Sequence, residues 1–279
     1  MQQATVFLVL LRRTVNMKQK TPITYYGGKQ KIAKWIVSQF PPHKSYIEPF
    51  AGGLAVFFER QKRAKTDVIN DINSDVYNLY LQWKENPEEL LRVLRATPYS
   101  LQDYKHCQSV YAGKTKASDI ERARAFFVNT NSSFGSRINS SWGRRYSGNI
   151  QTKPIEFQNS VAIFRAFLGR MKDVYIENRD ATKVIKSWDN KDALFYVDPP
   201  YPDSDQGHYS GYGMADFNNL LTVLKNIKGK FILSCYKKEA MDIDPKWLHR
   251  TKQTVLRATT VANKKRPKRK ESIFLNYTP

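Results

Sequence analysis

Residues Asp198 to Tyr201 place an acid, two prolines and an aromatic side chain directly after an apolar run. A carboxylate and a backbone carbonyl can accept the two N–H bonds of a planar amino group, which directs the nitrogen lone pair at an electrophile held in line. Pro199 and Pro200 would fix the backbone so that a carbonyl points into such a site. Tyr201 offers a flat face to a nucleobase turned out of its duplex. The alternative is a plain turn after a buried strand.

A glycine-rich turn, Ala51-Gly52-Gly53, follows a second strand-like run that ends in Glu48-Pro49-Phe50. Glycines at a strand-to-helix turn let a cofactor approach the backbone closely. The turn has neither a G-x-G-x-x-G cradle nor a Walker lysine, which argues against a dinucleotide or ATP. Asp71 ends the next strand-like run, where an acid would bind both ribose hydroxyls of a nucleoside cofactor. The alternative for Asp71 is a turn or helix cap before Asn73–Asp75.

A third pattern, Tyr25-Tyr26-Gly27-Gly28-Lys29, stands at the start of a helix-like stretch over Lys29–Phe40. A lysine at the start of a helix is unfavourable for the helix dipole unless an anion compensates it. The pattern therefore indicates an anion contact, such as a cofactor carboxylate. An ordinary turn before a helix is the other interpretation.

The elements that must position these residues alternate between strands and helices. The order strand, glycine-rich turn, helix, strand and acid is that of a nucleotide-type βαβ unit, in which the ligand lies at the carboxyl ends of parallel strands. The predicted strands are Ser45–Phe50, Asp67–Asp71, Val174–Glu177, Ala193–Val197, Lys230–Ser234 and Ser272–Tyr277, and the helices include Leu54–Arg60, Asp75–Glu85 and Asp216–Leu224.

A different composition over about 87–167 splits this pattern. Two helices are predicted near Glu88–Arg95 and Asp119–Asn129. The stretch Asn129–Asn149 is dense in Ser, Asn, Gly, Arg and aromatic residues without a sustained period, which predicts a loop-rich segment. The core sheet is therefore interrupted by a basic, aromatic insertion.

The charge balance points to a polyanionic partner. Lys and Arg number 46 against 25 Asp and Glu, a formal net charge of +21. Such a surface attracts nucleic acid by counterion release, with an anionic membrane or an unspecialised basic surface as the alternatives. The two cysteines predict neither a disulfide scaffold nor a zinc site and favour a reducing, cytoplasmic compartment. Val6–Leu11 is too short to span a bilayer, and residues 1–20 are interpreted as an appended arm.

Two basic segments are candidates for DNA contact. Arginines interleaved with aromatic residues suit phosphate contact, groove readout and filling of the space left by a flipped base, although a solvated basic loop has the same composition. The run Lys264–Lys270 lies between two apparent strands, which favours a basic hairpin loop on DNA phosphates over a nuclear signal or a solvated loop. The candidates are Arg137, Trp142, Arg144 and Arg145 with Phe134 and Tyr146 beside them, and Lys264, Lys265 and Arg266.

Taken in this order, the three patterns closely resemble the Dam-type family of DNA adenine-N6 methyltransferases. The matching stretches are Tyr25–Lys29, Ile47–Val56, Val68–Asp71 and Phe195–Tyr201, and the resemblance extends over about 24–277. It implies an α/β fold, with a Rossmann-like sheet for S-adenosylmethionine (AdoMet) built from 21–86 and 168–279. A mostly helical target-recognition insert over 87–167 would interrupt this sheet.

The resemblance also implies roles for single residues. Tyr25 and Lys29 would border the methionine end of AdoMet, Asp71 its ribose, and Asp198 both the cofactor and the target amine. Asp180 resembles the residue beside the cofactor adenine, but a cap of the next helix is an equal alternative. Some relatives carry tryptophan in place of Tyr25. The implied cofactor contacts are Tyr25, Tyr26, Gly28, Lys29, Glu48, Pro49, Phe50, Gly52, Asp71, Asp180 and Asp198, and the catalytic residues are Asp198, Pro199, Pro200 and Tyr201.

Double-stranded DNA is the expected partner, with a restriction endonuclease as a candidate second partner and no metal or membrane. Methylation of cytosine N4 or of adenine in RNA would use a similar tetrapeptide, but Tyr201 and the resemblance favour adenine in DNA. A C5-cytosine enzyme needs a thiolate nucleophile, and neither Cys107 nor Cys235 stands by a proline in a loop after a strand. A DNA-binding protein without catalysis is disfavoured by the intact Asp198 and Lys29.

Overall fold

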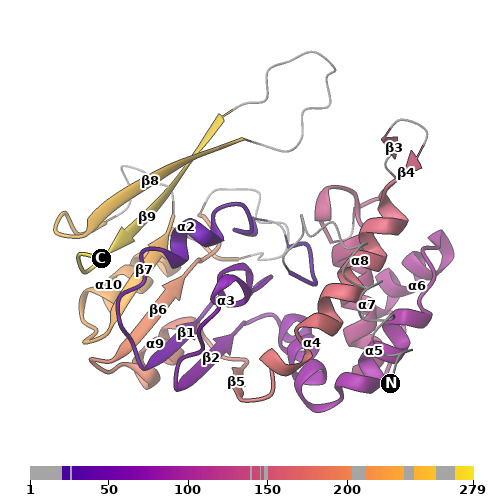
Figure 1. Ribbon diagram of the computed structural model, residues 1–279, viewed down its shortest axis with the longest axis horizontal. Helices are drawn as coiled ribbons and strands as arrows, with labels where there is room; N and C mark the ends of the chain where they lie inside the picture. The colour runs from indigo at the N-terminus through magenta and orange to yellow at the C-terminus, as the bar shows by residue number, and fades with distance from the viewer. Residues whose placement is uncertain are drawn as a thin grey trace, which may run out of the picture.

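A seven-stranded sheet forms the centre of one half of the molecule (Figure 1). The computed structural model describes residues 21–25, 27–138, 140–144, 146–147, 150–202, 211–235, 242–255 and 268–279. The strand order is β5-β2-β1-β6-β7-β9-β8, in which β9 is antiparallel to both of its neighbours and the other pairs are parallel. The strands are β1 (Ser45–Glu48), β2 (Thr66–Asn70), β5 (Val174–Glu177), β6 (Ala193–Val197), β7 (Lys230–Ser234), β8 (Leu248–Val255) and β9 (Lys268–Leu275).

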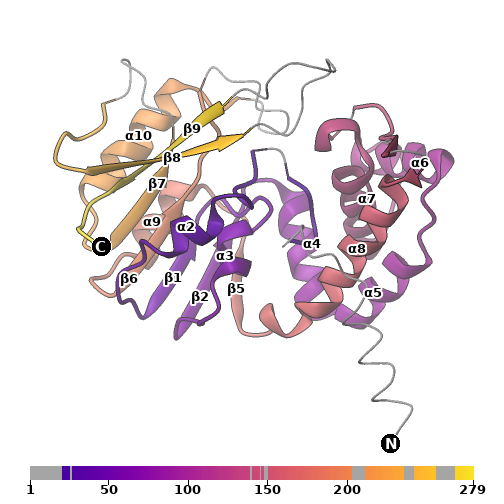
Figure 2. The same cartoon turned by 45° about the horizontal axis from the view of Figure 1, so that its top comes forward.

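Both faces of the sheet are covered, which explains why its central strands are almost entirely apolar. All five residues of β6 are buried, and successive side chains enter two different cores. Leu194 and Tyr196 belong to the core that includes α2 (Ala33–Val37) and α3 (Ala55–Glu59). Phe195 and Val197 face α9 (Ala181–Trp188) and α10 (Met214–Lys225) on the other side (Figure 2). This arrangement of helices on both faces of one sheet confirms the predicted Rossmann-like α/β fold.

The strand order changes direction between β1 and β6. The chain runs from β1 outward to β2 and later β5, and from β6 outward in the opposite direction to β7. In open α/β sheets, ligands bind at such a switch point, in the crevice beyond the carboxyl ends of the strands. The fold therefore directs attention to the residues that follow β1 and β6.

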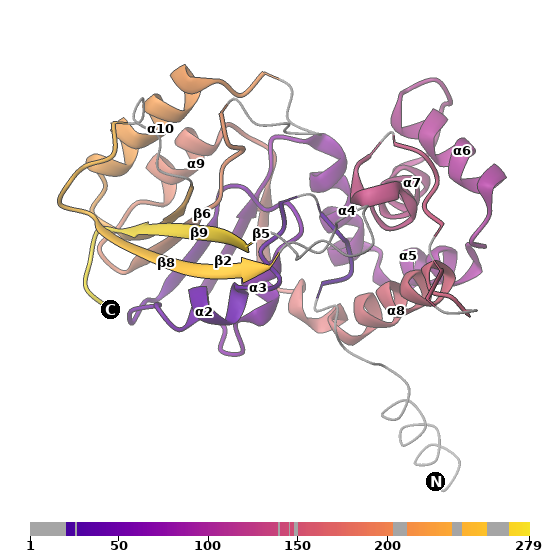
Figure 3. The same ribbon diagram turned by 90° about the horizontal axis from the view of Figure 1, so that it is seen from above.

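A helical layer made by the inserted residues lies beside the sheet (Figure 3). Helix α4 (Ser74–Glu85) packs against this layer, and Trp83 on α4 stacks on Phe164 of α8 with ring centroids 4.2 Å apart. Ser100 and Ser118 cap the first turns of α6 and α7 through their side chains. The insert comprises α5 (Pro87–Ala96), α6 (Leu101–Tyr111), α7 (Asp119–Ser132), α8 (Lys153–Ala166) and the short pair β3 (Tyr146–Ser147) and β4 (Ile150–Gln151).

Several predicted bounds were wrong. Turns occupy the first part of the predicted helix Lys29–Phe40, so α2 has only five residues. Helices α6 and α8 were not predicted, and α7 continues to Ser132 where a loop was expected. The amides and hydroxyls at the end of α7 bond back to helix carbonyls: Asn129 Nδ2 lies 3.0 Å from Ala125 O, and Ser133 Oγ 2.5 Å from Asn129 O. These bonds satisfy buried polar side chains in a helix end whose residue types disfavour a helix, so packing around α7 outweighs the local preference.

Candidate active site

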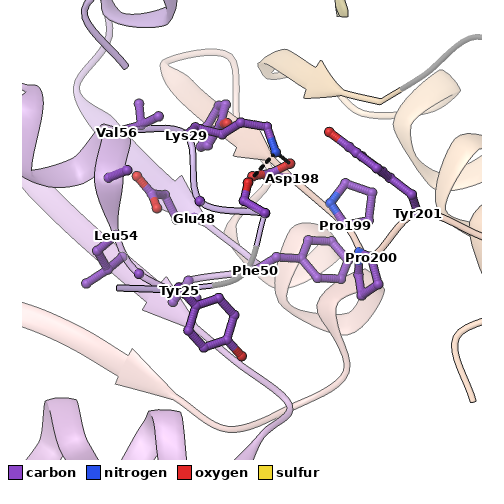
Figure 4. A pocket seen from close by; sticks show the side chains of 17 residues that line it. Tyr25, Lys29, Glu48, Phe50, Leu54, Val56, Asp198, Pro199, Pro200 and Tyr201 are labelled. Carbon is purple, nitrogen blue, oxygen red and sulfur yellow. Dashed lines mark hydrogen bonds and ion pairs between the residues drawn. The ribbon is translucent and has the colours of Figure 1, made fainter. Parts of the chain in front are cut away.

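A pocket lies where β1 and β6 end, at the switch point of the sheet (Figure 4). Its walls come from the turn before α2, the glycine-rich turn after β1 and the tetrapeptide after β6. The three sequence patterns therefore meet in one place, although they are far apart along the chain. The pocket lining includes these predicted residues: Tyr25, Gly28, Lys29, Glu48, Phe50, Gly52, Asp198, Pro199, Pro200 and Tyr201.

The glycine-rich turn is shaped by its contact with Tyr25. A Cβ on Gly52 would stand 3.2 Å from the Tyr25 ring, and one on Gly53 would stand 3.0 Å from the Tyr25 Cβ. Gly52 also has φ +45°, a conformation that side chains disfavour. The two glycines thus let the first and second patterns pack together and leave backbone exposed to the pocket.

An ion pair joins the first and third patterns. Lys29 Nζ lies 2.8 Å from Asp198 Oδ1 and 3.0 Å from the Gly27 carbonyl oxygen, and the Lys29 side chain is only 7% exposed. Burial lowers the pKa of Lys29, but the facing Asp198 carboxylate, together with Tyr201 and Glu271, more than offsets this, so that the pKa lies above its ordinary value. Lys29 therefore stays charged near neutral pH and positions the Asp198 carboxylate.

Tyr201 completes this side of the pocket. Lys29 Nζ lies 5.1 Å from the centre of the Tyr201 ring, and the Tyr201 hydroxyl lies 3.3 Å from Ser234 Oγ. Burial raises the pKa of Tyr201 to about 12, so the phenol is neutral. The ring is thus fixed at both its face and its hydroxyl.

Glu48 is the second acid of the pocket. It is 1% exposed and accepts a hydrogen bond of 2.5 Å from the Tyr46 hydroxyl. Burial raises the pKa of Glu48 to about 8, and the nearby Asp198 carboxylate adds to the rise. Beneath Tyr46, the Arg60 guanidinium lies 4.0 Å from the ring centre and pairs with the buried Asp67. Glu48 therefore rests on a buried polar layer.

Three predicted cofactor residues do not line this pocket. The Asp71 carboxylate accepts hydrogen bonds of 2.9 Å from the backbone N–H groups of Gly52 and Asn73, so it supports the glycine turn from below. Asp180 is exposed and caps α9 by accepting from Thr182 N and Lys183 N. Pro49 contributes its carbonyl to Asn70 Nδ2. The predicted Tyr26 lies outside the described residues.

Sequence reasoning missed Tyr196, which also lines the pocket. It lies on β6 two positions before Asp198, which follows the end of the strand, and an i, i+2 spacing in extended chain directs both side chains to the same side. Its hydroxyl is buried and has no hydrogen-bond partner among the residues that the structure describes. The i, i+2 spacing from the acid was the available signal. The lining also includes Gly27, Ala51, Gly53, Leu54, Ala55 and Val56, all adjacent to predicted positions.

The structure separates the DNA-contact candidates of the insert. Arg137 and Arg144 are exposed, and Phe134 is 58% exposed. Trp142 is half-buried and packs on Tyr99 with ring centroids 5.2 Å apart. Arg145, Lys264, Lys265 and Arg266 lie outside the described residues, as does the 1–20 arm.

Two features are absent from the described part of the chain. No helix there has the length and apolar character needed to cross a bilayer. No group of three or more His, Cys, Asp or Glu side chains there could hold a metal ion.

Comparison with known proteins identifies the family. The chain is 29% identical over 226 residues to the type II methyltransferase M1.LlaDCHI of Lactococcus lactis subsp. cremoris, which covers 75% of each chain. It is 23% identical over 301 residues to the type II methyltransferase M2.HphI of Haemophilus parahaemolyticus, covering 92% of this chain and 88% of that one. The DNA N-6-adenine-methyltransferase of Escherichia phage P1 is 26% identical over 208 residues, 71% of this chain and 26% of the phage protein.

The family described as D12 class N6 adenine-specific DNA methyltransferase matches residues 25–255. This range includes all three patterns of the pocket and the whole insert. The match confirms the Dam-type resemblance and the predicted reaction on adenine in DNA. The chain belongs to the D12 class of N6 adenine-specific DNA methyltransferases.

Proposed function

We propose that the pocket binds AdoMet as the methyl donor for adenine N6. The observation that carries this proposal is the convergence of the Gly52 turn, Lys29 and Asp198 in one pocket. The Asp198 carboxylate suits a sulfonium cation, and the one Lys or Arg of the described lining, Lys29, is already paired with Asp198 instead of being left for a polyphosphate. The buried Tyr196 hydroxyl offers a further polar contact for a ligand. The lining thus fits a cationic nucleoside cofactor.

The cofactor contacts can be divided by position in the pocket. Tyr25 and Lys29 would border the methionine end, and the backbone at Gly52, which lines the pocket, would allow close approach. Phe50 would pack against the nucleoside. Asp71 would contact the ribose and Asp180 the adenine from positions outside the observed lining.

The residues after β6 would act on the target base. AdoMet supplies an electrophilic methyl group. Asp198 and the Pro199 carbonyl would accept the two N–H bonds of the adenine amine, so that its lone pair points along the line of transfer. Pro200 helps to fix the carbonyl direction, and the Tyr201 ring would stack on the flipped adenine. Transfer is direct, because the amine itself is the nucleophile.

Residues 87–167 would form the target-recognition insert on double-stranded DNA. Arg137 and Arg144 are exposed cations of the insert, and the last three cations of the basic run, Lys268, Arg269 and Lys270, lie on β9 of the sheet. The formal charge of +21 supports phosphate contact on both. Relatives are named type II methyltransferases, so we further propose a cytoplasmic role in a prokaryote or phage, with a restriction endonuclease as a candidate partner.

Methyl transfer from isotopically labelled AdoMet tests the donor and the base together. The protein is incubated with unmethylated duplex DNA, and the DNA is digested to nucleosides. Label in N6-methyladenosine is the expected result, and sequencing of the labelled sites would give the recognition sequence. An absence of label from a folded protein that also fails to bind AdoMet would refute the proposed donor.

A further inference from the structure

Asn131 joins the insert to the segment that leads into the pocket. Its Oδ1 accepts hydrogen bonds of 3.1 Å from both the backbone N–H and the hydroxyl of Thr24, and its Nδ2 donates to the Pro22 carbonyl oxygen at 3.1 Å. Within the insert, Ser160 Oγ donates to Oδ1 and Nδ2 donates to Phe127 O. The side chain is 3% exposed. Both amide donors and the carbonyl are engaged, so the amide is held on both sides of the junction.

On the catalytic side, this junction is one residue from the pocket. Thr24 precedes Tyr25, which packs on the glycine-rich turn, and Lys29 of the same segment pairs with Asp198. A displacement of Thr24 therefore moves a wall of the pocket. It also changes the position of the cation beside the catalytic acid.

On the insert side, the same junction is close to exposed residues proposed to contact DNA. Helix α7 ends at Ser132, and the following loop carries Phe134 and Arg137. Phe134 N donates to Ser141 O and Gly143 N donates to Ser132 O, each at 2.7 Å. These hydrogen bonds join the two sides of the loop to each other and to the end of the helix. A force on this loop would be transmitted to α7 instead of being absorbed by loop movement.

We propose that Asn131 couples DNA binding by the insert to the geometry of the cofactor pocket, so that DNA and the methyl donor bind cooperatively. This inference rests on the proposed AdoMet site and DNA face. Each ligand favours one arrangement of the junction, and the second ligand then binds an arrangement that is already formed. Because coupling is reciprocal, DNA tightens cofactor binding by the same factor by which cofactor tightens DNA binding. Asn131 is a positioning residue in this scheme and contacts neither ligand.

The coupling factor is the quantity to measure. The dissociation constant of S-adenosylhomocysteine, the unreactive demethylated cofactor, is determined for the full chain by calorimetry, with and without a saturating duplex that contains the mapped methylation site. For the unsubstituted protein we expect DNA to tighten binding about tenfold, within the usual range of such couplings. Asn131→Ala should bring the ratio close to one, because Thr24 N–H and Pro22 C=O lose their common partner.

Asn129→Ala is the matched control. Asn129 lies on the same helix and is 0% exposed, but the partners of its Nδ2 among the described residues are Cys107 O and Ala125 O, both inside the insert, at 3.0 Å. Asn129→Ala should therefore destabilise the insert without breaking the contacts to Thr24 and Pro22, and the ratio of the two dissociation constants should stay unchanged. Equal ratios in Asn131→Ala and the unsubstituted protein, or an equal loss in both variants, would overturn the proposal.

A milder pair of variants keeps the test decisive if Asn131→Ala does not fold. Thr24→Val removes one hydrogen bond to Asn131 and should lower the coupling ratio severalfold. Thr130→Val removes a buried hydroxyl that bonds Phe127 O inside the insert, and should not lower the ratio. Failure of the unsubstituted protein to bind S-adenosylhomocysteine would overturn the proposed donor as well, whereas binding with an unchanged ratio in Thr24→Val would overturn the coupling alone.

Discussion

The two ends of strand β6 carry the same ion pair in different surroundings. At the amino end, Lys44 Nζ lies 2.8 Å from Asp192, and the side chains are 62% and 38% exposed. At the carboxyl end, Lys29 Nζ lies 2.8 Å from Asp198, and the side chains are 7% and 19% exposed. Distance therefore does not distinguish the two pairs, whereas burial does. Charges in water interact weakly, while charges removed from water depend strongly on each other.

The largest difference between the two ion pairs should appear when the acid of each pair, Asp198 or Asp192, is removed. Asp198→Ala deletes the carboxylate proposed to orient the target amine, so turnover should fall by at least about a thousandfold, as when an oriented polar group is removed from an active site. Binding to duplex DNA should persist in a gel-shift assay. Asp192→Ala is the control and should leave turnover unchanged. Methylation by Asp198→Ala at more than a tenth of the unsubstituted rate would contradict the assignment.

Removal of the two lysines should give the next largest difference. Lys29→Met leaves Asp198 without its counter-ion in a largely buried site, which should lower the free energy of unfolding by about 3 kcal/mol and kcat/KM by about a hundredfold. Lys44→Met should change neither measurably, because water solvates both partners. Urea unfolding and methyl-transfer kinetics on the two variants provide the test. Similar losses in both would show that burial is not the deciding factor.

Burial at the carboxyl end of the sheet should also make the free energy of unfolding depend on pH, through Glu48. In the unfolded chain a glutamate loses its proton near pH 4.5, whereas burial in the folded pocket raises the pKa of Glu48 to about 8. Between these values the folded state binds the additional proton, so this group makes stability fall as pH rises, by about 1.4 kcal/mol per pH unit. Above about pH 8 the contribution is constant.

Comparing the unsubstituted protein with Glu48→Gln isolates this contribution. The substitution keeps an oxygen that can accept from Tyr46 but removes the titration, so the difference between the two unfolding free energies should change with pH between about 5 and 8. The exposed Glu88 of α5 provides a matched substitution, since Glu88→Gln makes the same chemical change outside the pocket. A constant difference for Glu48→Gln would show that Glu48 is ionised throughout.

The centre of the sheet was largely predictable because strands β6 and β7 are buried on both faces. Both strands begin and end at the predicted residues, since continuous apolar runs bounded by polar turns leave little choice of register. The edge strand β5 also has the predicted bounds, although Tyr175 at its second position is exposed. Helix α6 was missed because its buried face is made of Tyr104, Cys107 and Val110, which give a weak hydrophobic pattern. Its signal lay in the cap, where Ser100 accepts from Asp103 N.

The site was predictable as a set of motifs but not as a set of contacts. The tetrapeptide, the glycine turn and Lys29 could be identified because each has a local spacing. The Lys29–Asp198 pair could not be identified, because sequence reasoning had assigned the lysine to a cofactor carboxylate. Asp71 shows the same limit: its position after β2 was predicted, but its bond to Gly52 N depends on how two distant turns pack.

The smallest effects should come from substitution of exposed cations. These substitutions compare the carboxyl edge of the sheet, which is proposed to face DNA, with the amino edge, which is not. The insert reaches the carboxyl edge through the contact of Asn131 with Thr24, so Arg137 and Arg144 are expected on the DNA-facing side. Arg137→Ala and Arg144→Ala should each weaken DNA binding severalfold and reduce the slope of log affinity against log salt by about 0.9, the value for one phosphate contact. Lys44→Ala removes the same charge from the amino edge and should leave the slope unchanged. If all three variants lowered the slope equally, DNA affinity would depend on net charge alone, and the insert would have no special place in binding.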